Sequence, residues 1–391
     1  MEREQAIRTM RELLSLLVER RGSDLFITVG FPPALKVDGR IMPVSKVRLT
    51  PENARGLTHA IMNERQLREF EATKECNFAI APTGVGRFRV NAFIQQGHTG
   101  MVLRTIETRV PTLEQLGLPT VMQDIALTRR GLVIMVGGTG SGKSTSLAAM
   151  INHRNEHSQG HIVTLEDPIE FIHPHKHCIV TQREIGVDTE DWGIALKNAL
   201  RQAPDVILLG EIRDRETMEF GLAFAETGHL AMATLHANSA NQALDRIINF
   251  FPADRHAQLF MDMSLNVRGI IAQRLIKRAN GQGRVAAVEV MLNSPLMADL
   301  MQKGEIPQLK DLMSRSNELG MKTFDQALFD LYENGDISYE EGLRSADSVN
   351  ELRLRIKLES RRGPPPGVDG TSTLSLEETE PGPGTFGPRG S

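Results

Sequence analysis

One glycine-rich segment constrains the fold of this chain more than any other feature. Residues Gly137–Ser144 read Gly-Gly-Thr-Gly-Ser-Gly-Lys-Ser and fit the pattern G-x-x-x-x-G-K-[ST]. The apolar run Gly131–Gly137 predicts a strand before the loop, and Ser144–His153 predicts a helix after it. In such a loop the backbone N–H groups turn inward around phosphate oxygens, and the helix amino terminus adds partial positive charge. The segment therefore predicts an α/β domain that binds a nucleotide.

The residues of this loop have separate expected tasks. Lys143 is expected to bridge the β- and γ-phosphates of ATP, and the Ser144 hydroxyl is expected to bind Mg²⁺. ATP and Mg²⁺ are accordingly the expected ligands. The predicted nucleotide-binding residues are Gly137, Gly138, Thr139, Gly140, Ser141, Gly142, Lys143, Ser144 and Thr145.

Two acidic segments each follow an apolar run. The first run, Asp205–Leu209, is a predicted strand with Glu211 just beyond its end. Ligands of open α/β sheets bind beyond the carboxyl ends of strands, so Glu211 can hold Mg²⁺ through water or polarise the attacking water. Without the glycine-rich loop, a surface acid after a core strand would be the simpler interpretation.

The other acidic segment, Thr164–Phe171, follows the predicted strand His161–Leu165 and contains Glu166, Asp167 and Glu170. One of these carboxylates could act as a general base for a nucleophilic water, because a clustered acid raises the pKa of its neighbour toward the useful range. A solvated acidic turn is the alternative, and the segment taken alone favours it.

Composition excludes several classes of protein. Lys and Arg number 45 against 49 Asp and Glu, and the net charge of −4 disfavours binding of nucleic acid through overall charge. Two cysteines, Cys76 and Cys178, exclude a disulfide scaffold and a four-cysteine zinc site. The apolar runs are too short for a membrane helix, and the amino terminus lacks the apolar region of a signal peptide. A cytoplasmic protein is expected.

The chain is expected to have two folded parts and a tail. Residues 1–106 mix short β-like runs with helical ones, which is typical of a small α+β domain. After about residue 111 the pattern is α/β, and helical patterns dominate from about 238 to 362. Residues 363–391 contain 7 Gly and 6 Pro, and this composition predicts a disordered tail.

A histidine-containing segment, Thr227–Asn238, follows the loop and the acidic segments in an order and spacing that resemble the secretion ATPases. In that family Thr164–Phe171 corresponds to the Asp box, Asp205–Asp214 to the Walker B segment and Thr227–Asn238 to the His box. The resemblance covers about residues 3–358. It is to the hexameric ATPases of type II secretion and type IV pili, specifically their PilT/PilU retraction branch.

The resemblance implies a fold. A small PAS-like α+β domain over 1–106 would be joined by a hinge or linker over 107–115 to a RecA-like P-loop core over 116–362. In that core, flanking helices would cover a mostly parallel sheet. ATP would lie between the two domains of one subunit, and domain closure about the hinge would be the mechanical output.

The resemblance also implies roles for individual residues. By position, Glu170 matches the catalytic glutamate of the family, Glu166 its neighbour, and Glu211 the Walker B glutamate that acts on Mg²⁺ and water. His229 and His236 match the His-box residues that link the γ-phosphate site to the subunit interface. Without the resemblance, packing or surface roles would be the better interpretation of two such histidines.

Three arginines are candidates for action on a neighbouring subunit. Arg87, Arg89 and Arg104 lie in a region whose family counterparts approach a neighbour's triphosphate. Alternation along a strand puts Arg87 and Arg89 on one face, which suits an anionic partner. A solvated basic strand face is the alternative.

Two features favour the retraction branch, and within it the PilU group. Assembly and type II secretion ATPases usually carry a four-cysteine zinc element, which two cysteines cannot build. The segment Pro295–Lys303 replaces basic positions of the corresponding PilT helix. The resemblance therefore implies a homohexameric motor for pilus retraction and twitching motility, accessory to a PilT-type paralogue. It would act at the inner-membrane pilus base with the platform protein of the pilus machine, without nucleic acid or zinc.

Three alternatives are compatible with parts of the sequence. One is a type IV pilus assembly or type II secretion ATPase, and another is a nucleotide-gated regulatory subunit of a PilT-type hexamer. Intact Lys143, Glu170 and Glu211 argue against the inactive subunit. The third, a RecA-like DNA translocase, would need a basic stripe that the sequence lacks.

A cluster of histidines could suggest a metal site. His173, His175 and His177 recur at period two, so on a strand they would share a face and could bind Zn²⁺. Pro174 interrupts the run, and a surface loop is the favoured interpretation.

Overall fold

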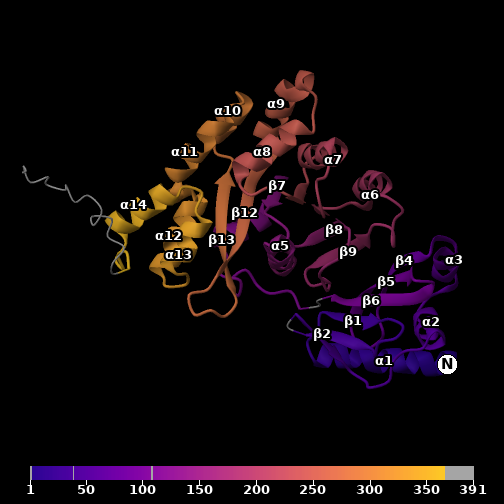
Figure 1. Cartoon of the computed structure of the whole chain (residues 1–391). Helices are drawn as coiled ribbons and strands as arrows, with labels where there is room; N and C mark the ends of the chain where they lie inside the picture. The colour runs from indigo at the N-terminus through magenta and orange to yellow at the C-terminus, as the bar shows by residue number, and fades with distance from the viewer. Residues whose placement is uncertain (1, 38, 107–108, 366–391) are drawn as a thin grey trace, which may run out of the picture. The chain divides into compact units, whose positions relative to one another are not determined.

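The computed structural model describes residues 2–37, 39–106 and 109–365, which are coloured in Figure 1. The described residues form two compact units, the first within 2–275 and 285–323 and the second within 276–284 and 324–365. The predicted hinge over 107–115 lies partly outside the described residues, and so does the predicted tail from residue 366 onward. Within the described ranges, no helix is both long and apolar enough to cross a bilayer.

The amino-terminal part of the first unit is built on a six-stranded sheet in the order β3-β2-β1-β6-β5-β4. Neighbouring strands in it are antiparallel. Its elements are α1 (Arg3–Glu19), β1 (Asp24–Ile27), β2 (Ala34–Val37), β3 (Arg40–Pro43), α2 (Pro51–Ala60), α3 (Glu64–Thr73), β4 (Glu75–Ile80), β5 (Arg87–Gln95) and β6 (His98–Ile106). The expected α+β organisation of this region is confirmed.

Local sequence explains these elements. The Thr50 side chain accepts a hydrogen bond from the Asn53 N–H at 3.2 Å and caps α2, and Pro51 occupies the first position of that helix. Along β5, Phe88 and Val90 are buried in the core, while Arg87 and Arg89, which alternate with them, lie on the other face.

The rest of the first unit is organised around a seven-stranded sheet in the order β13-β12-β7-β11-β10-β8-β9. Its strands are β7 (Gly131–Val136), β8 (Gly160–Glu166), β9 (Cys178–Glu184), β10 (Val206–Leu209), β11 (Leu230–Leu235), β12 (Val267–Lys277) and β13 (Arg284–Leu292). All neighbouring pairs from β12 to β9 are parallel. This arrangement confirms the expected mostly parallel sheet.

Helices flank this sheet on both faces. They are α4 (Val121–Leu127), α5 (Lys143–His157), α6 (Trp192–Ala199), α7 (Arg215–Glu226), α8 (Ala240–Asn249), α9 (His256–Asn266), α10 (Pro295–Gln302) and α11 (Leu309–Ser314). Val133 and Met135 of β7 share a buried cluster with α5 residues, whereas Leu132 lies beneath Gly221 of α7. Because successive side chains of a strand point to opposite faces, α5 and α7 cover opposite faces of the sheet.

The expectation that helical patterns dominate from 238 to 362 was incomplete. The run Val267–Lys277 is the strand β12, which pairs with β7 through registers such as Ile270 with Ile134. A short apolar run does not distinguish a buried strand from a buried helix, and pairing with a distant strand decides the outcome here.

Between residues 324 and 365, the last that the structure describes, the second unit is mainly helical, and it also includes the hairpin residues Ile276–Arg284. Its helices are α12 (Phe324–Glu333), α13 (Tyr339–Ser345) and α14 (Val349–Glu359). The Asp325 carboxylate is buried and accepts hydrogen bonds from the N–H groups of Asp347 and Ser348, at 2.8 and 3.0 Å. This carboxylate fixes the entry to α14.

Candidate active site

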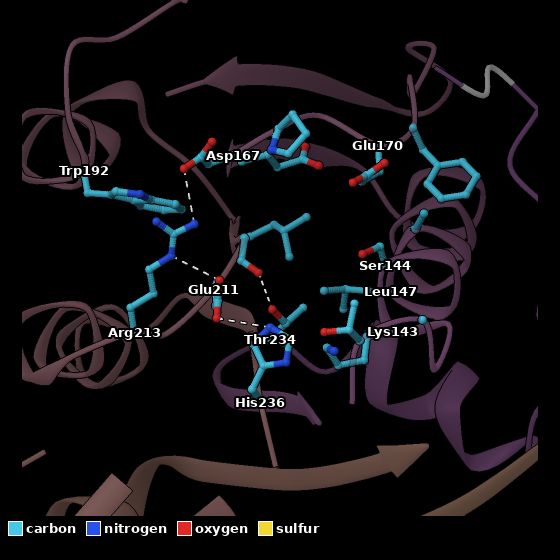
Figure 2. Close-up of a pocket in the computed structure, with 18 of the residues that line it drawn as sticks. Lys143, Ser144, Leu147, Asp167, Glu170, Trp192, Glu211, Arg213, Thr234 and His236 are labelled. Carbon is cyan, nitrogen blue, oxygen red and sulfur yellow. Dashed lines mark hydrogen bonds and ion pairs between the residues drawn. The ribbon is translucent and has the colours of Figure 1, made fainter. Parts of the chain in front are cut away.

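Four neighbouring strands of the seven-stranded sheet carry the predicted site residues. Strands β7, β11, β10 and β8 are adjacent and parallel, so their carboxyl ends meet at one edge of the sheet. The glycine-rich loop follows β7, His236 follows β11, Glu211 follows β10, and the acidic segment containing Glu170 follows β8. This is the edge at which open α/β sheets bind ligands, and Figure 2 shows the resulting arrangement.

The glycine-rich loop is packed tightly against β12. Gly142 has φ +88°, and a Cβ there would come within 2.7 Å of the Gln273 side chain. Gln273 is buried, accepts a hydrogen bond from Ser146 Oγ at 2.7 Å and donates to the Ser141 carbonyl at 2.9 Å. The side-chain amide of Gln273 therefore holds the chain at Ser141 and at Ser146, before and after Lys143.

The Lys143 ammonium is turned onto its own loop. Lys143 is 9% exposed, and its Nζ donates to the carbonyl oxygens of Gly137 and Gly138 at 2.7 and 3.0 Å. Desolvation lowers the pKa of Lys143, and the charge of Glu211 opposes this shift. Ser144 is exposed at the amino terminus of α5, a helix whose first turn carries no acid to offset its partial positive charge.

Glu211 lies between Arg213 and His236. Its Oε2 accepts from Arg213 Nε at 3.1 Å, and its Oε1 lies 3.4 Å from His236 Nε2. Arg213 also donates through Nη2 to Asp167 Oδ2 at 3.2 Å, so it links the carboxylates that follow β10 and β8. Its guanidinium lies 5.7 Å from the centre of the Trp192 ring.

Glu166, the last residue of β8, and Glu170, four residues later, differ in environment. The Glu166 carboxylate accepts from Thr164 Oγ1 at 2.6 Å and from Gln182 Nε2 at 3.2 Å. Desolvation raises the pKa of Glu166 to about 6, against the opposing effect of these hydrogen bonds. Glu170 is exposed, and its carboxylate faces the cavity in Figure 2. Glu170 is thus the acid with access to a nucleophilic water.

These residues surround a cavity of about 330 Å³. The predicted site residues that line it are Thr139, Gly140, Lys143, Ser144, Glu166, Glu170, Glu211 and His236. The oxygens of Ser144 and Glu211 are hard donors of the kind that Mg²⁺ prefers. A glycine-rich loop, a lysine, two oxygen-bearing side chains and an exposed carboxylate are therefore brought together.

His229 does not line this cavity. It precedes β11 whereas His236 follows it, so the two histidines lie at opposite ends of that strand. The His229 Nδ1 lies 3.0 Å from Thr227 Oγ1. The spacing of the histidines along the sequence did not reveal this separation.

The candidate arginines lie in the amino-terminal part of the first unit. Arg89 and Arg104 are directly opposite each other on β5 and β6, and both line a shallow pocket on the sheet. Arg104 pairs with the buried Asp24 at 2.8 Å. The Arg87 Nε is buried, with no hydrogen-bond partner among the residues described. Two like charges placed opposite each other on a sheet are unfavourable unless an anion is nearby.

The prediction of a surface loop at the histidine cluster is wrong for its first histidine. His173 is buried and lines the active-site cavity, whereas Pro174, His175 and His177 are exposed. Burial lowers the pKa of His173 to about 4, so it is neutral at physiological pH. Its Nδ1 has no hydrogen-bond partner in the described ranges.

Sequence reasoning missed four side chains of this site. Arg213, Gln182 and Gln273 form hydrogen bonds with predicted residues, and Trp192 lies beside Arg213. None of the four is an acid, lysine or histidine of the kind that a motif highlights. Only the position of Arg213, two residues after Glu211, could have suggested its role.

Comparisons with known proteins identify the family of this chain. The model of the family "Type II/IV secretion system protein" matches residues 5–315. The type IV pilus ATPase PilU of Pseudomonas aeruginosa is 60% identical over 95% of this chain and 97% of its own length. The type IV pilus retraction ATPase PilT of the same organism is 42% identical over 86% of this chain and 97% of its own.

A solved structure of the pilus retraction motor PilT with bound ADP matches with a TM-score of 0.83 and 38% identity. The match covers 88% of this chain and 98% of that one. The DotB ATPase of Legionella pneumophila matches with a TM-score of 0.74 and 27% identity, over 85% and 94% of the two chains. The chain therefore belongs to the type II/IV secretion ATPase family, in the branch that contains PilU and PilT.

Proposed function

We propose that this chain is a motor ATPase of type IV pilus retraction, a PilU-type accessory to a PilT-type motor. The observation that carries the proposal is the meeting of Lys143, Glu170 and Glu211 around one cavity, because an inactive subunit would have no need of all three. The similarity to PilU over nearly the whole of both chains supports the assignment to pilus retraction.

The loop and the two acids suit hydrolysis of ATP. Lys143 would exchange the carbonyl oxygens of Gly137 and Gly138 for phosphate oxygens, which offer more negative charge. The Ser144 hydroxyl and Glu211, the latter through water, would hold Mg²⁺, which neutralises phosphate charge when bound. Glu170 would accept a proton from the water that attacks the γ-phosphate in line, with Glu166 as its less accessible neighbour.

The histidines and arginines would connect sites of neighbouring subunits. His236 contacts Glu211 and would sense the γ-phosphate, while His229 would act at the subunit boundary. In a homohexamer, one or more of Arg87, Arg89 and Arg104 would reach the triphosphate of the neighbouring subunit. Partners at the inner membrane would be the PilT-type hexamer and the platform protein of the pilus machine.

Retraction of labelled pili in living cells tests this proposal. Strains lacking this protein, its PilT-type paralogue or both would be complemented with the wild type or with Lys143→Ala. We expect loss of the protein to reduce retraction while pili still assemble, and Lys143→Ala to fail to restore it. Loss of pilus assembly would instead indicate an assembly motor, and full complementation by Lys143→Ala would indicate a regulatory subunit that need not hydrolyse ATP.

A further inference from the structure

One side-chain amide of β9 holds the acidic segment that follows β8. The Gln182 Nε2 donates to the Phe171 carbonyl at 2.9 Å and to Glu166 Oε1 at 3.2 Å. The Gln182 Oε1 accepts from the His173 N–H at 2.8 Å. Both amide hydrogens and the amide oxygen are thus used in one place.

A second side chain of β9 holds the other end of the segment. Glu184 is buried, and its Oε2 accepts from the Ile169 N–H at 3.2 Å. Gln182 and Glu184 are two residues apart on one strand and so project from the same face. Glu170 therefore lies between two anchored neighbours, Ile169 and Phe171, although its own carboxylate is exposed.

The residues that hold the segment around Glu170 differ from those that hold the glycine-rich loop. The hydrogen bonds of Gln182 end on the backbone around Glu170 and on the Glu166 carboxylate, and none of those described reaches the glycine-rich loop. The loop is braced from β12 by Gln273 instead. Nucleotide affinity and placement of the general base thus depend on different strands of the sheet.

From these contacts we infer that Gln182 is a positioning residue, which fixes Glu170 relative to the γ-phosphate without touching the nucleotide. The inference rests on the proposed ATPase function. A displacement of about 1 Å in a catalytic group can lower a rate about 100-fold. Loss of Gln182 should therefore lower the rate of hydrolysis and leave binding of the nucleotide in place.

The test uses the purified full-length chain and the variant Gln182→Met, which has nearly the same length and shape but no hydrogen-bonding amide. We expect kcat to fall by about 10- to 100-fold. The Kd for ADP, measured by calorimetry, should change by less than about twofold, because a twofold change is within the scatter expected of a residue that makes no contact with the ligand. If Gln182 only stabilised the fold, its loss would not lower kcat while leaving the Kd for ADP nearly unchanged.

Thr181→Val is the matched control. Thr181 adjoins Gln182 on β9 but projects from the opposite face, where its hydroxyl pairs with His161 Nε2 at 2.9 Å. The Thr181→Val variant also loses one polar contact of β9. Its kcat should nevertheless stay within about twofold of the wild type, because Thr181 does not touch the acidic segment. Gln182→Asn, which keeps the amide but is one methylene shorter, gives the comparison if Gln182→Met does not fold.

Three outcomes would overturn the inference. Unchanged kcat in a folded Gln182→Met or Gln182→Asn variant would show that Glu170 needs no such support. Parallel losses of ADP affinity and kcat would indicate general damage to the site. An equal loss of kcat in Thr181→Val would assign the effect to β9 as a whole. Absence of ATP hydrolysis by the wild-type chain would instead contradict the proposed function, so the two failures are distinguishable.

Discussion

The ammonium nitrogen of Lys143 lies 2.7 Å from the carbonyl oxygen of Gly137, six residues earlier on the same loop. The position of the lysine is therefore set by the same backbone that would surround the phosphates. On binding of ATP the ammonium would exchange these carbonyl oxygens for phosphate oxygens, and its charge would then stabilise the transferred phosphate.

Replacing this lysine should remove activity and keep the fold. In Lys143→Ala we expect ATP hydrolysis to fall at least about 100-fold, because a charge at the transferred phosphate is lost. The Lys143 side chain lines the cavity, so water can replace it beside the two carbonyls, and Tm should fall by no more than about 2–4 °C. A steady-state ATPase assay and a melting curve measure both quantities. Wild-type turnover in the variant would refute the assignment of the loop.

Glu211→Gln should trap ATP. The amide keeps the shape of the side chain and loses the negative charge that faces Arg213 and His236. Hydrolysis should fall about 100-fold, as expected when a group that acts on the attacking water is lost. Bound nucleotide, separated on a desalting column and identified by chromatography, should be mainly ATP in the variant and ADP in the wild type. Equal ATP content in the two proteins would make Glu211 a surface acid.

Burial of His173 predicts a dependence of stability on pH. Its pKa is about 4 in the folded chain against an ordinary value of 6.5, so the unfolded chain takes up a proton at higher pH than the folded one. The free energy of unfolding is therefore not reduced by this residue above about pH 6.5, and it decreases as the pH falls toward 4. At pH 5 the loss amounts to about 2 kcal/mol, or about 4–8 °C in Tm.

The variant His173→Phe isolates this effect. Its Tm should fall less than that of the wild type between pH 7 and pH 5, because the variant has no proton to take up at this position. Glu166, whose raised pKa acts in the opposite direction, is present in both proteins and cancels in the comparison. His177→Phe, at an exposed position, is the control and should follow the wild type. An identical dependence of Tm on pH in all three proteins would show that protonation of His173 does not destabilise the fold.

If an arginine completes a neighbouring site, two inactive proteins should restore activity together. Lys143→Ala would be mixed in turn with Arg87→Ala, Arg89→Ala and Arg104→Ala. In a mixed ring some interfaces join an intact loop to an intact arginine, so partial ATPase activity should return. Arg→Lys should restore little, since lysine lacks the planar, bidentate geometry of arginine. Exchange of subunits would be verified by mass spectrometry of tagged chains, and exchange without recovered activity would exclude all three arginines.

The sequence predicts the parts of this site that a single segment determines. The loop Gly137–Thr145 and the acids after β8 and β10 are local patterns, because each follows an apolar strand and the parallel sheet aligns the strand ends. His229 and His236 lie in one segment as well, but the strand between them carries them to opposite ends.

The supporting residues could not be predicted in this way. Gln273 braces Ser141 from 132 residues away, and Arg213 reaches Asp167 over a separation of 46. Such partners are brought together by the order of strands in the sheet, which no local pattern encodes. The strand β12 was missed for the same reason, since its apolar run becomes a strand only by pairing with β7.

The stacking of Arg213 on Trp192 has a practical consequence. Trp192 is the only tryptophan of the sequence, and its ring lines the active-site cavity. The guanidinium beside it also pairs with Glu211, so a nucleotide that displaced Glu211 would change the electric field at the indole. The intrinsic fluorescence of Trp192 would therefore report binding and release of a nucleotide at this site, without an attached dye.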